Sequence, residues 1–162
     1  QGPDIIAQHR AHERAIYEAL LARQGQRRPL KEPIVLELKP HQAAMLRGVP
    51  ALLAELGFSL EEFGRHHFLV REVPHLLESV PGQTLEEAVQ EALVEEEGWL
   101  ERLLISLACR AAVRRGRRLR PEEVAAILTP YQRPGAPTLC PHGGPIALII
   151  RREALARQLG LG

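Results

Sequence analysis

Five residues of this 162-residue chain could together bind a transition metal, and they lie in three separate segments. The two cysteines are Cys109 and Cys140, and His142 follows the second at Cys-x-His spacing. His9 and Glu13 lie near the other end of the chain. Thiolate and imidazole favour zinc-like ions, and an added carboxylate admits manganese. If the fold joins the three segments, they form a metal site; otherwise they are unrelated core and surface residues.

Each segment also has a simpler interpretation when it is taken alone. His9 and Glu13 are four residues apart in a stretch with helical spacing, so they would share one helix face, which could equally be a solvated face. Cys140 and His142 lie in a segment rich in proline and glycine, where a loop can direct both side chains the same way. Cys109 follows an apolar run and is typical of a small buried residue. The spacing excludes a zinc finger or ribbon, which needs paired ligand knuckles.

The strongest charge cluster is a run of arginines that begins directly after Cys109. Arginine offers phosphate a fork of N–H donors, so this run is a candidate DNA-binding surface. A solvated basic helix end, favoured by the helix dipole, is the alternative. The candidate DNA-binding residues are Arg110, Arg114, Arg115, Arg117 and Arg118, and Arg120 extends the run.

Composition limits the class of protein. Hydrophobic residues make up 45% and charged residues 25%, which is ordinary for one globular domain or two small subdomains. The formal net charge is +1, so affinity for nucleic acid must come from local patches. No apolar run approaches the roughly 20 residues that span a bilayer, so no membrane partner is expected. Two cysteines without secretory context favour the cytoplasm and argue against a disulfide scaffold.

Hydrophobic periodicity and the positions of glycine and proline predict an α+β (mixed α/β) fold. Thr84, with Glu87 three residues later, has capping-box spacing and predicts a helix N-cap. Pro29 and Pro33 are expected to bracket a linker. Strands are expected at 4–7, 34–38, 68–73 and 146–150, and helices at 9–23, 41–56 (broken near 48–50), 84–116 (parted near 98), 121–128 and 152–159, with connectors at 58–63 and 130–145.

The motifs resemble those of a known family. The chain is similar throughout its length to the C-terminal domain of the DNA mismatch-repair protein MutL, in the branch that carries a latent nicking endonuclease. The family motif Asp-Gln-His-Ala, two residues, Glu, four residues, Glu corresponds here to Ala7-Gln8-His9-Arg10-Ala11-His12-Glu13 and Glu18. Its second motif, Ala-Cys-Arg/Lys, matches Ala108-Cys109-Arg110, and its third, Cys-Pro-His-Gly-Arg-Pro, matches Cys140-Pro141-His142-Gly143-Gly144-Pro145.

The resemblance implies a site, an activity and partners. It implies that zinc and/or manganese, one or two ions, is held by His9, Glu13, Cys109, Cys140 and His142, with Glu13, His9 and the position of Ala7 catalytic. It implies a homodimer that nicks duplex DNA and works with a mismatch-recognition protein, with ATP acting only through an N-terminal domain outside this chain. The dimerisation and endonuclease subdomain would comprise 1–32 and 101–162, with a regulatory subdomain inserted at 33–100.

Three departures from the family motifs leave the activity open, and three hypotheses are compared. Ala7 replaces the motif aspartate, Arg10 replaces a small alanine, and Gly144 replaces an arginine that could contact phosphate. The leading hypothesis is a metal-dependent DNA-nicking endonuclease, with Glu18 considered as a replacement carboxylate. The alternative is a dimerisation and partner-binding module whose zinc is structural; a generic α/β domain without metal comes third. A sliding-clamp partner is left as an option, because the Gln and Leu of the segment 26–33 are out of register with the clamp-binding motif.

Overall fold

The computed structural model describes residues 4–23 and 26–161. Its helices and antiparallel strands confirm the α+β class. None of the helices within these residues is long and apolar enough to cross a membrane. The helices are α1 (Gln8–Leu21), α2 (Pro40–Arg47), α3 (Pro50–Glu55), α4 (Gly82–Ala92), α5 (Trp99–Ala111), α6 (Pro121–Leu128) and α7 (Arg152–Gln158), with 3-10 turns η1 (His75–Leu77) and η2 (Thr129–Tyr131). The strands are β1 (Asp4–Ile6), β2 (Arg27–Glu37), β3 (Ser59–Glu62), β4 (His67–Pro74) and β5 (Ala147–Ile149).

The chain divides into two compact units. Unit 1 consists of Gln1–Ala15 and Ala112–Gly162, and unit 2 consists of Ile16–Ala111. The boundary between the two units falls within the sequence of the helix α1, after Ala15. The functional subdivision expected from the sequence, with boundaries at 32/33 and 100/101, stays a prediction.

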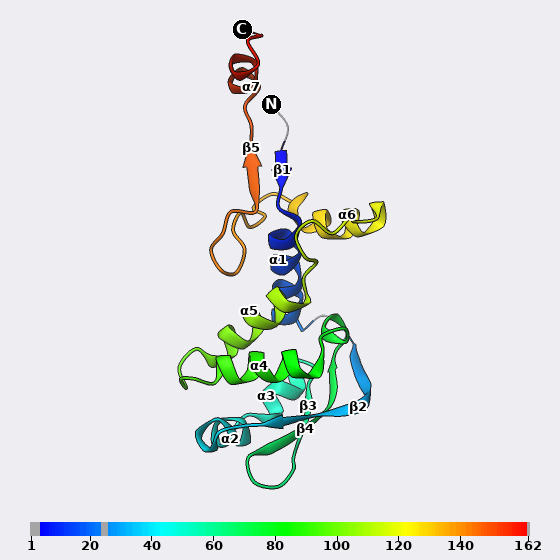
Figure 1. Ribbon diagram of the computed structural model, residues 1–162, viewed down its shortest axis with the longest axis vertical. Coiled ribbons are helices and arrows are strands. Elements are labelled where there is room, and N and C mark those ends of the chain that lie inside the picture. The colour runs from blue at the N-terminus through cyan, green and yellow to red at the C-terminus, as the bar shows by residue number, and fades with distance from the viewer. Residues whose placement is uncertain (1–3, 24–25, 162) are drawn as a thin grey trace. The chain divides into compact units, whose positions relative to one another are not determined.

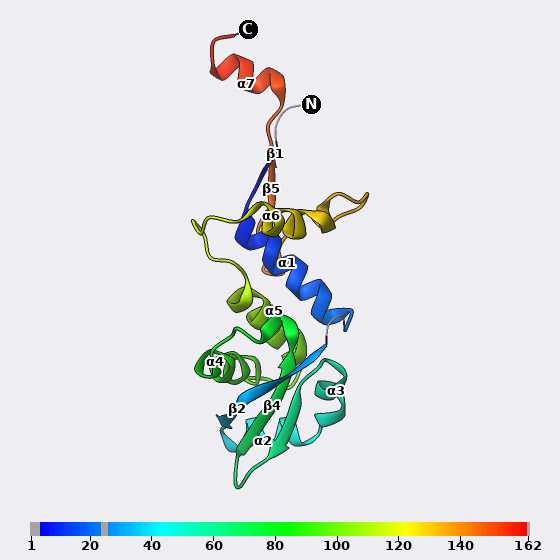
Figure 2. The same cartoon turned by 90° about the vertical axis from the view of Figure 1, so that its right-hand side faces the viewer.

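Unit 2 is built on a three-stranded antiparallel sheet. Strand β4 lies between β2 and β3, and the helix α4 contacts both α5 and β2 (Figure 2). Leucines at helical spacing on α5 supply its buried face, among them Leu103, Leu104 and Leu107. The fully or nearly buried side chains of this unit also include Leu36, Val70, Leu77, Leu85, Ala88 and Leu93. Continuous apolar burial is what holds this unit together.

The prediction of a linker between Pro29 and Pro33 was wrong, because this segment forms part of the strand β2. Both prolines lie within β2, which pairs with β4 on one side only and so forms an edge of the sheet. Proline lacks a backbone N–H, but an edge strand tolerates it because one side makes no ladder bonds. The pairing register shifts between Pro29 and Ile34, so the strand absorbs both prolines as an irregularity.

Two further local predictions were wrong, whereas the remaining elements were confirmed. The segment expected as a connector contains β3, whose sequence Ser-Leu-Glu-Glu has little strand propensity and gains its structure by pairing with β4. Thr84 does not cap α4, since that helix already begins at Gly82 and Leu85 N–H donates to the Pro81 carbonyl. The break between α2 and α3 and the division between α4 and α5 agree with the sequence prediction.

Unit 1 contains a two-stranded antiparallel ribbon and a small apolar core. Strands β1 and β5 lie side by side (Figure 1), with Ile5 opposite Leu148. The core is Ala11, Ile127, Cys140 and Ile146, with Ile6, Val113, Leu119 and Tyr131 partly buried against it. Large apolar side chains on the ribbon remain exposed, Leu148 at 60% and Ile149 at 68%.

Candidate metal centre

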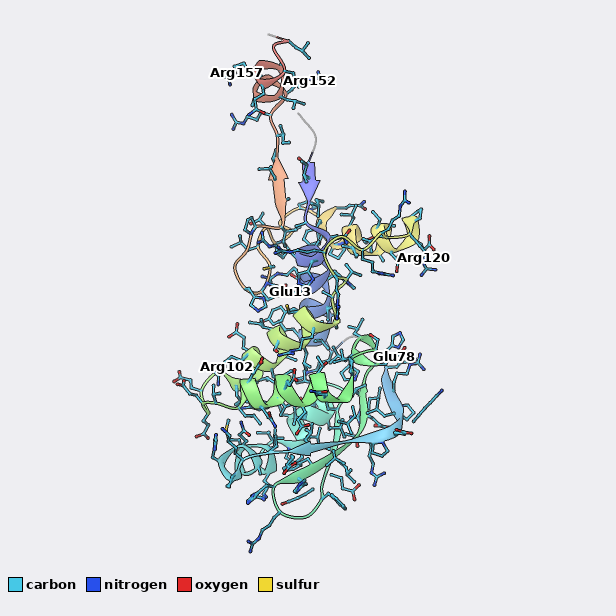
Figure 3. The ribbon with its side chains drawn as sticks, in the orientation of Figure 1. Glu13, Glu78, Arg102, Arg120, Arg152 and Arg157 are labelled. Carbon is cyan, nitrogen blue, oxygen red and sulfur yellow. The ribbon has the colours of Figure 1, made fainter. Side chains whose placement is uncertain are left out.

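The helix α1 carries two of the candidate ligands on one face. His9 and Glu13 are separated by one helical turn, and Nε2 of His9 lies 3.7 Å from Oε2 of Glu13. Glu13 projects from α1 (Figure 3) and is only 2% exposed, although it is a carboxylate. A buried carboxylate is costly unless cations or hydrogen-bond donors surround it, so the groups around Glu13 must offset that cost.

The loop that precedes β5 presents Cys140 and His142. Cys140 N–H donates to the Gly144 carbonyl at 2.8 Å, and Gly143 N–H donates to the Cys140 carbonyl at 2.8 Å, which closes a tight turn. Gly143 adopts a φ of +84°, a conformation that residues with a side chain rarely take. Gly144 N–H also points at Sγ of Cys140, 3.3 Å away, as a donor suited to a thiolate. Within this turn Cys140 is buried and His142 is exposed.

Glu13, Cys140 and His142 converge within unit 1. One ligand atom from each lies within 4.8 Å of the other two. The two oxygens of Glu13 serve different partners, since Oε1 contacts Nδ1 of His142 and Oε2 faces His9. A carboxylate between two imidazoles, with a thiol beside it, is a geometry that one or two metal ions could occupy.

The residue Val113 fixes the orientation of His9. Nδ1 of His9 lies 2.8 Å from the Val113 carbonyl. A carbonyl only accepts, so Nδ1 must carry a proton, and Nε2 is the ring nitrogen that faces Glu13 and could bind a metal. This is the tautomer that a metal-ligating histidine needs, held by an outer-shell hydrogen bond.

His12, which the sequence analysis did not include in the site, holds the same backbone segment from its other side. Val113 N–H donates to Nδ1 of His12 at 2.9 Å. Burial lowers the pKa of His12, and the neighbouring His9 and Arg117 lower it further, so the imidazole stays neutral and can accept this bond. The two histidines, three residues apart on α1, thus satisfy both backbone groups of Val113. The spacing of the histidines was visible in the sequence, but their shared partner was not.

Two arginines on α1 hold the cysteine loop and were likewise not identified as loop-positioning residues. Arg10 donates through an η nitrogen to the Pro145 carbonyl at 2.8 Å, and Arg14 donates through Nε to the Leu139 carbonyl at 2.9 Å. Leu139 and Pro145 pair with each other in an isolated antiparallel bridge that brackets the turn. Because Arg10 and Arg14 are one helical turn apart, they bind both sides of the loop that carries Cys140.

The remaining candidate residues lie on other elements. Cys109 is half-buried on the last turn of α5 and belongs to unit 2. Ala7 is exposed and occupies the N-cap position of α1, where its carbonyl accepts from Ala11 N–H at 2.9 Å. Across the described ranges 4–23 and 26–161, neither Asp4 nor Glu18 joins a group of potential ligands. The oxygen ligand that Ala7 lacks therefore has no substitute among these two carboxylates.

The candidate DNA-binding arginines differ in how strongly their charge is neutralised. Arg110, in unit 2, forms ion pairs with Glu87 and Glu91. In unit 1, Arg117 pairs with Glu123, while the remaining members Arg114, Arg115 and Arg118 are exposed. Arg120, at the start of α6 (Figure 3), approaches Glu122 and Glu123. The exposed arginines Arg114, Arg115 and Arg118 lie in a segment outside the helices.

Glu123 shapes the start of α6. The Arg120 backbone N–H and then the Arg117 guanidinium lower the pKa of Glu123 from 4.5 to about 2. Its Oε2 accepts from the Arg120 N–H at 2.8 Å, which satisfies one of the donors left unpaired at a helix N-terminus. The same carboxylate accepts from Arg117 at 2.8 Å and so restrains the arginine-rich turn.

The chemistry of the donor set fits a zinc-like ion. Glu13 offers oxygen, His142 and His9 offer nitrogen, and Cys140 offers sulfur. Thiolate and imidazole together select zinc over magnesium or calcium, and a carboxylate keeps manganese within range. The buried position of Glu13 among these groups is also what a cation would stabilise.

The fold and this cluster define a mixed α/β domain with a candidate metal centre beside a small sheet. A family model described as the MutL C terminal dimerisation domain matches residues 3–119. The chain belongs to this family of mismatch-repair dimerisation domains, as the motif resemblance predicted.

Similar curated proteins are each called DNA mismatch repair protein MutL. The one from Syntrophobacter fumaroxidans is 40% identical over 156 residues, which cover 90% of this chain and 23% of that protein. Those from Methanoculleus marisnigri and Thermus thermophilus are each 36% identical, covering 93% and 96% of this chain and 27% and 28% of the respective proteins. The chain thus spans about a quarter of the length of these relatives.

Proposed function

We propose that this domain carries a metal-dependent endonuclease site that nicks duplex DNA in mismatch repair, and that it works as a homodimer. The observation that carries the proposal is the convergence of Glu13, Cys140 and His142 within 4.8 Å. Membership of the MutL C-terminal family and the orientation of His9 by Val113 support it.

The site residues divide into ligands and residues that position them. Glu13, His9, Cys140 and His142 would hold zinc and/or manganese, and a ligand role for Cys109 stays a prediction from the family motifs. When bound, the metal would act as a Lewis acid on a phosphodiester and lower the pKa of a water molecule. Buried Glu13 keeps its two oxygens directed at two histidines, and the Val113 carbonyl keeps the proton of His9 on Nδ1. Arg114, Arg115 and Arg118 would neutralise DNA phosphates near the site.

The proposed partners follow from the family and from exposed surface. The ribbon formed by β1 and β5 exposes Ile5, Leu148 and Ile149, and a second copy of the chain would cover such a surface. Duplex DNA and a mismatch-recognition protein are proposed from family membership, and ATP would act only through an N-terminal domain. The segment 26–33 lies just before and within β2, and its binding to a sliding clamp stays a prediction.

A non-catalytic dimerisation and partner-binding module with a structural zinc is the second candidate function. The observation that favours it is Ala7, which supplies no oxygen ligand and has no substitute carboxylate in the ligand groups of the described residues. Under this alternative the Glu13, Cys140 and His142 cluster binds zinc but does not cleave DNA.

A plasmid assay separates the two candidates. The chain is incubated with supercoiled plasmid and manganese, preferably with its ATPase half, and compared with Cys140→Ser and Ala7→Asp. Nicking by the unchanged chain that Cys140→Ser abolishes supports the endonuclease. Nicking only after Ala7→Asp supports the structural-zinc module, and elemental analysis that finds neither zinc nor manganese in the unchanged chain rejects both.

A further inference from the structure

The guanidinium of Arg10 lies in the space that a side chain at position 144 would occupy. A Cβ built on Gly144 would lie 3.0 Å from both Cζ and Nε of Arg10, closer than ordinary van der Waals contact. The absence of a side chain at Gly144 is therefore what gives Arg10 room in its present position. The two residues are matched in three dimensions although they lie near opposite ends of the chain.

The same space borders the candidate metal centre. The position of that Cβ also lies 3.3 Å from Sγ of Cys140. Arg10 thus brings a permanent positive charge to the edge of a ligand set that contains the Glu13 carboxylate and the Cys140 thiol. A cation beside metal ligands is suited to a substrate anion that must approach the metal.

Arg10 is held in place without losing all its donors. One η nitrogen donates to the Pro145 carbonyl, which is a neutral acceptor, so the charge of the guanidinium is not cancelled. Within residues 4–23 and 26–161, no carboxylate forms an ion pair with Arg10. The side chain is half-buried, so it is preorganised and still accessible.

We propose that Arg10 binds the DNA phosphodiester next to the metal centre, from the space that the absence of a side chain at Gly144 leaves open. This inference rests on the proposed endonuclease function and names one of its substrate-binding residues. The two departures from the family motifs, arginine at position 10 and glycine at position 144, then form one exchange: the guanidinium reaches the same place from α1 instead of from the cysteine loop.

The test measures the affinity for a short DNA duplex over a series of KCl concentrations, with the chain loaded with zinc and without manganese. Arg10→Ala is expected to reduce the slope of log affinity against log salt by about one. Arg10→Gln should reduce it equally, because glutamine can keep the bond to the Pro145 carbonyl but carries no charge. Arg157→Ala, which removes an exposed arginine from α7 in the same unit, serves as the charge-matched control and should leave the slope unchanged.

The reciprocal variant tests the exchange itself. Gly144→Arg combined with Arg10→Ala should restore the slope, whereas Gly144→Arg alone should not improve binding, because Arg10 already occupies the space beside position 144. An unchanged slope for Arg10→Ala, full rescue by Arg10→Gln, or no measurable duplex binding by the unchanged chain would each overturn the proposal.

Zinc content and plasmid nicking are measured on the same preparations, so the two proposals are tested separately. Zinc retained by Arg10→Ala shows that the ligand set remains assembled; if it is lost, the slopes of Arg10→Gln and the reciprocal variant decide the question. Nicking by the unchanged chain with no effect of Arg10 on the slope rejects the role of Arg10 alone. A chain without metal or nicking, but with the expected slopes, rejects the endonuclease and leaves the phosphate contact standing.

Discussion

The two units of this domain are stabilised in different ways. Unit 2 buries leucines from α4, α5 and its three-stranded sheet in a continuous apolar core. Unit 1 has a much smaller core, in which Cys140 is itself a member, and large apolar residues on its ribbon stay exposed. Its chemistry-bearing loop is held by polar bonds from Arg10 and Arg14.

The difference teaches where stability and function reside. Unit 2 needs no ligand to fold, because the burial of its apolar side chains within one chain already supplies the favourable free energy. Unit 1 leaves apolar surface and a buried carboxylate that a second copy and a metal ion would stabilise. We therefore expect unit 2 to respond mainly to core mutations and unit 1 mainly to metal, partner and charge.

The largest expected effect comes from the core of unit 2. Leu107→Ala should lower the free energy of unfolding by about 3 kcal/mol, since Leu107 is fully buried and its truncation leaves a cavity. Urea denaturation measures the change. Val94→Ala, at a side chain that is 60% exposed, is the control and should change it by less than about 0.5 kcal/mol. A loss below about 1 kcal/mol for Leu107→Ala would contradict the role of this core.

A charge introduced on the ribbon of unit 1 should weaken the proposed homodimer. Leu148→Asp is expected to weaken self-association by about 2 kcal/mol, roughly 30-fold in Kd, because it buries an unpaired carboxylate in the proposed dimer interface. Sedimentation velocity over a concentration series measures this. Phe63→Asp, at a side chain of unit 2 that is 56% exposed, provides the comparison and should leave association unchanged. Equal association of both variants would exclude the ribbon as the interface.

Removal of metal should loosen unit 1 selectively. Chelation is expected to accelerate amide hydrogen exchange in peptides that cover 138–146 about tenfold, equivalent to about 1.4 kcal/mol, because the turn around Cys140 would lose the proposed metal cross-link to Glu13. Hydrogen-exchange mass spectrometry measures both units in one experiment. Peptides from α5 around Leu104 should keep their protection, and zinc should reverse the change at 138–146. Uniform acceleration across both units would show that their stabilities are not separable.

Ala7→Asp tests whether a better N-cap at the start of α1 raises the stability of the domain. An aspartate at this N-cap position is expected to stabilise the domain by about 1 kcal/mol, because its carboxylate can accept a backbone N–H from the first turn. Thermal unfolding measures the gain. Ala7→Asn should give a comparable gain without adding a charged ligand, so an increase in nicking confined to Ala7→Asp would separate metal chemistry from helix capping. If neither variant is stabilised, Ala7 is not an N-cap in solution.

The smallest effect concerns Glu123 and depends on pH. Its pKa is lowered to about 2 in the folded chain from 4.5, so the stability that it contributes is present above pH 4.5 and is lost as the pH falls toward 2. Glu123→Gln should therefore be less stable at pH 7 and should approach the unchanged chain at low pH. Urea denaturation at several pH values follows the difference. Glu122→Gln is the adjacent control, and a pH-independent difference for Glu123→Gln would contradict this linkage.

The sequence predicted most elements of the fold because their signals are local. Helical spacing and glycine or proline breaks located α1, the α2–α3 pair and the α4–α5 pair. The prediction failed where tertiary pairing overrides local preference: β2 accommodates two prolines as an edge strand, and β3 forms from a sequence without strand propensity. Thr84 failed as a cap because Pro81 and Gly82 already start α4.

The sequence by itself determined the family, the α+β class and the residue types of the candidate centre, since motifs, composition and periodicity are properties of the chain. Only the tertiary structure decided which atoms meet. It directs the two oxygens of Glu13 to different histidines and places the proton of His9 on Nδ1 through the Val113 carbonyl. It also places the guanidinium of Arg10 next to Gly144. Apart from the pair on α1, these contacts join residues far apart in the sequence, and no local pattern encodes them, because they arise when α1 packs against the cysteine loop and the segment around Val113.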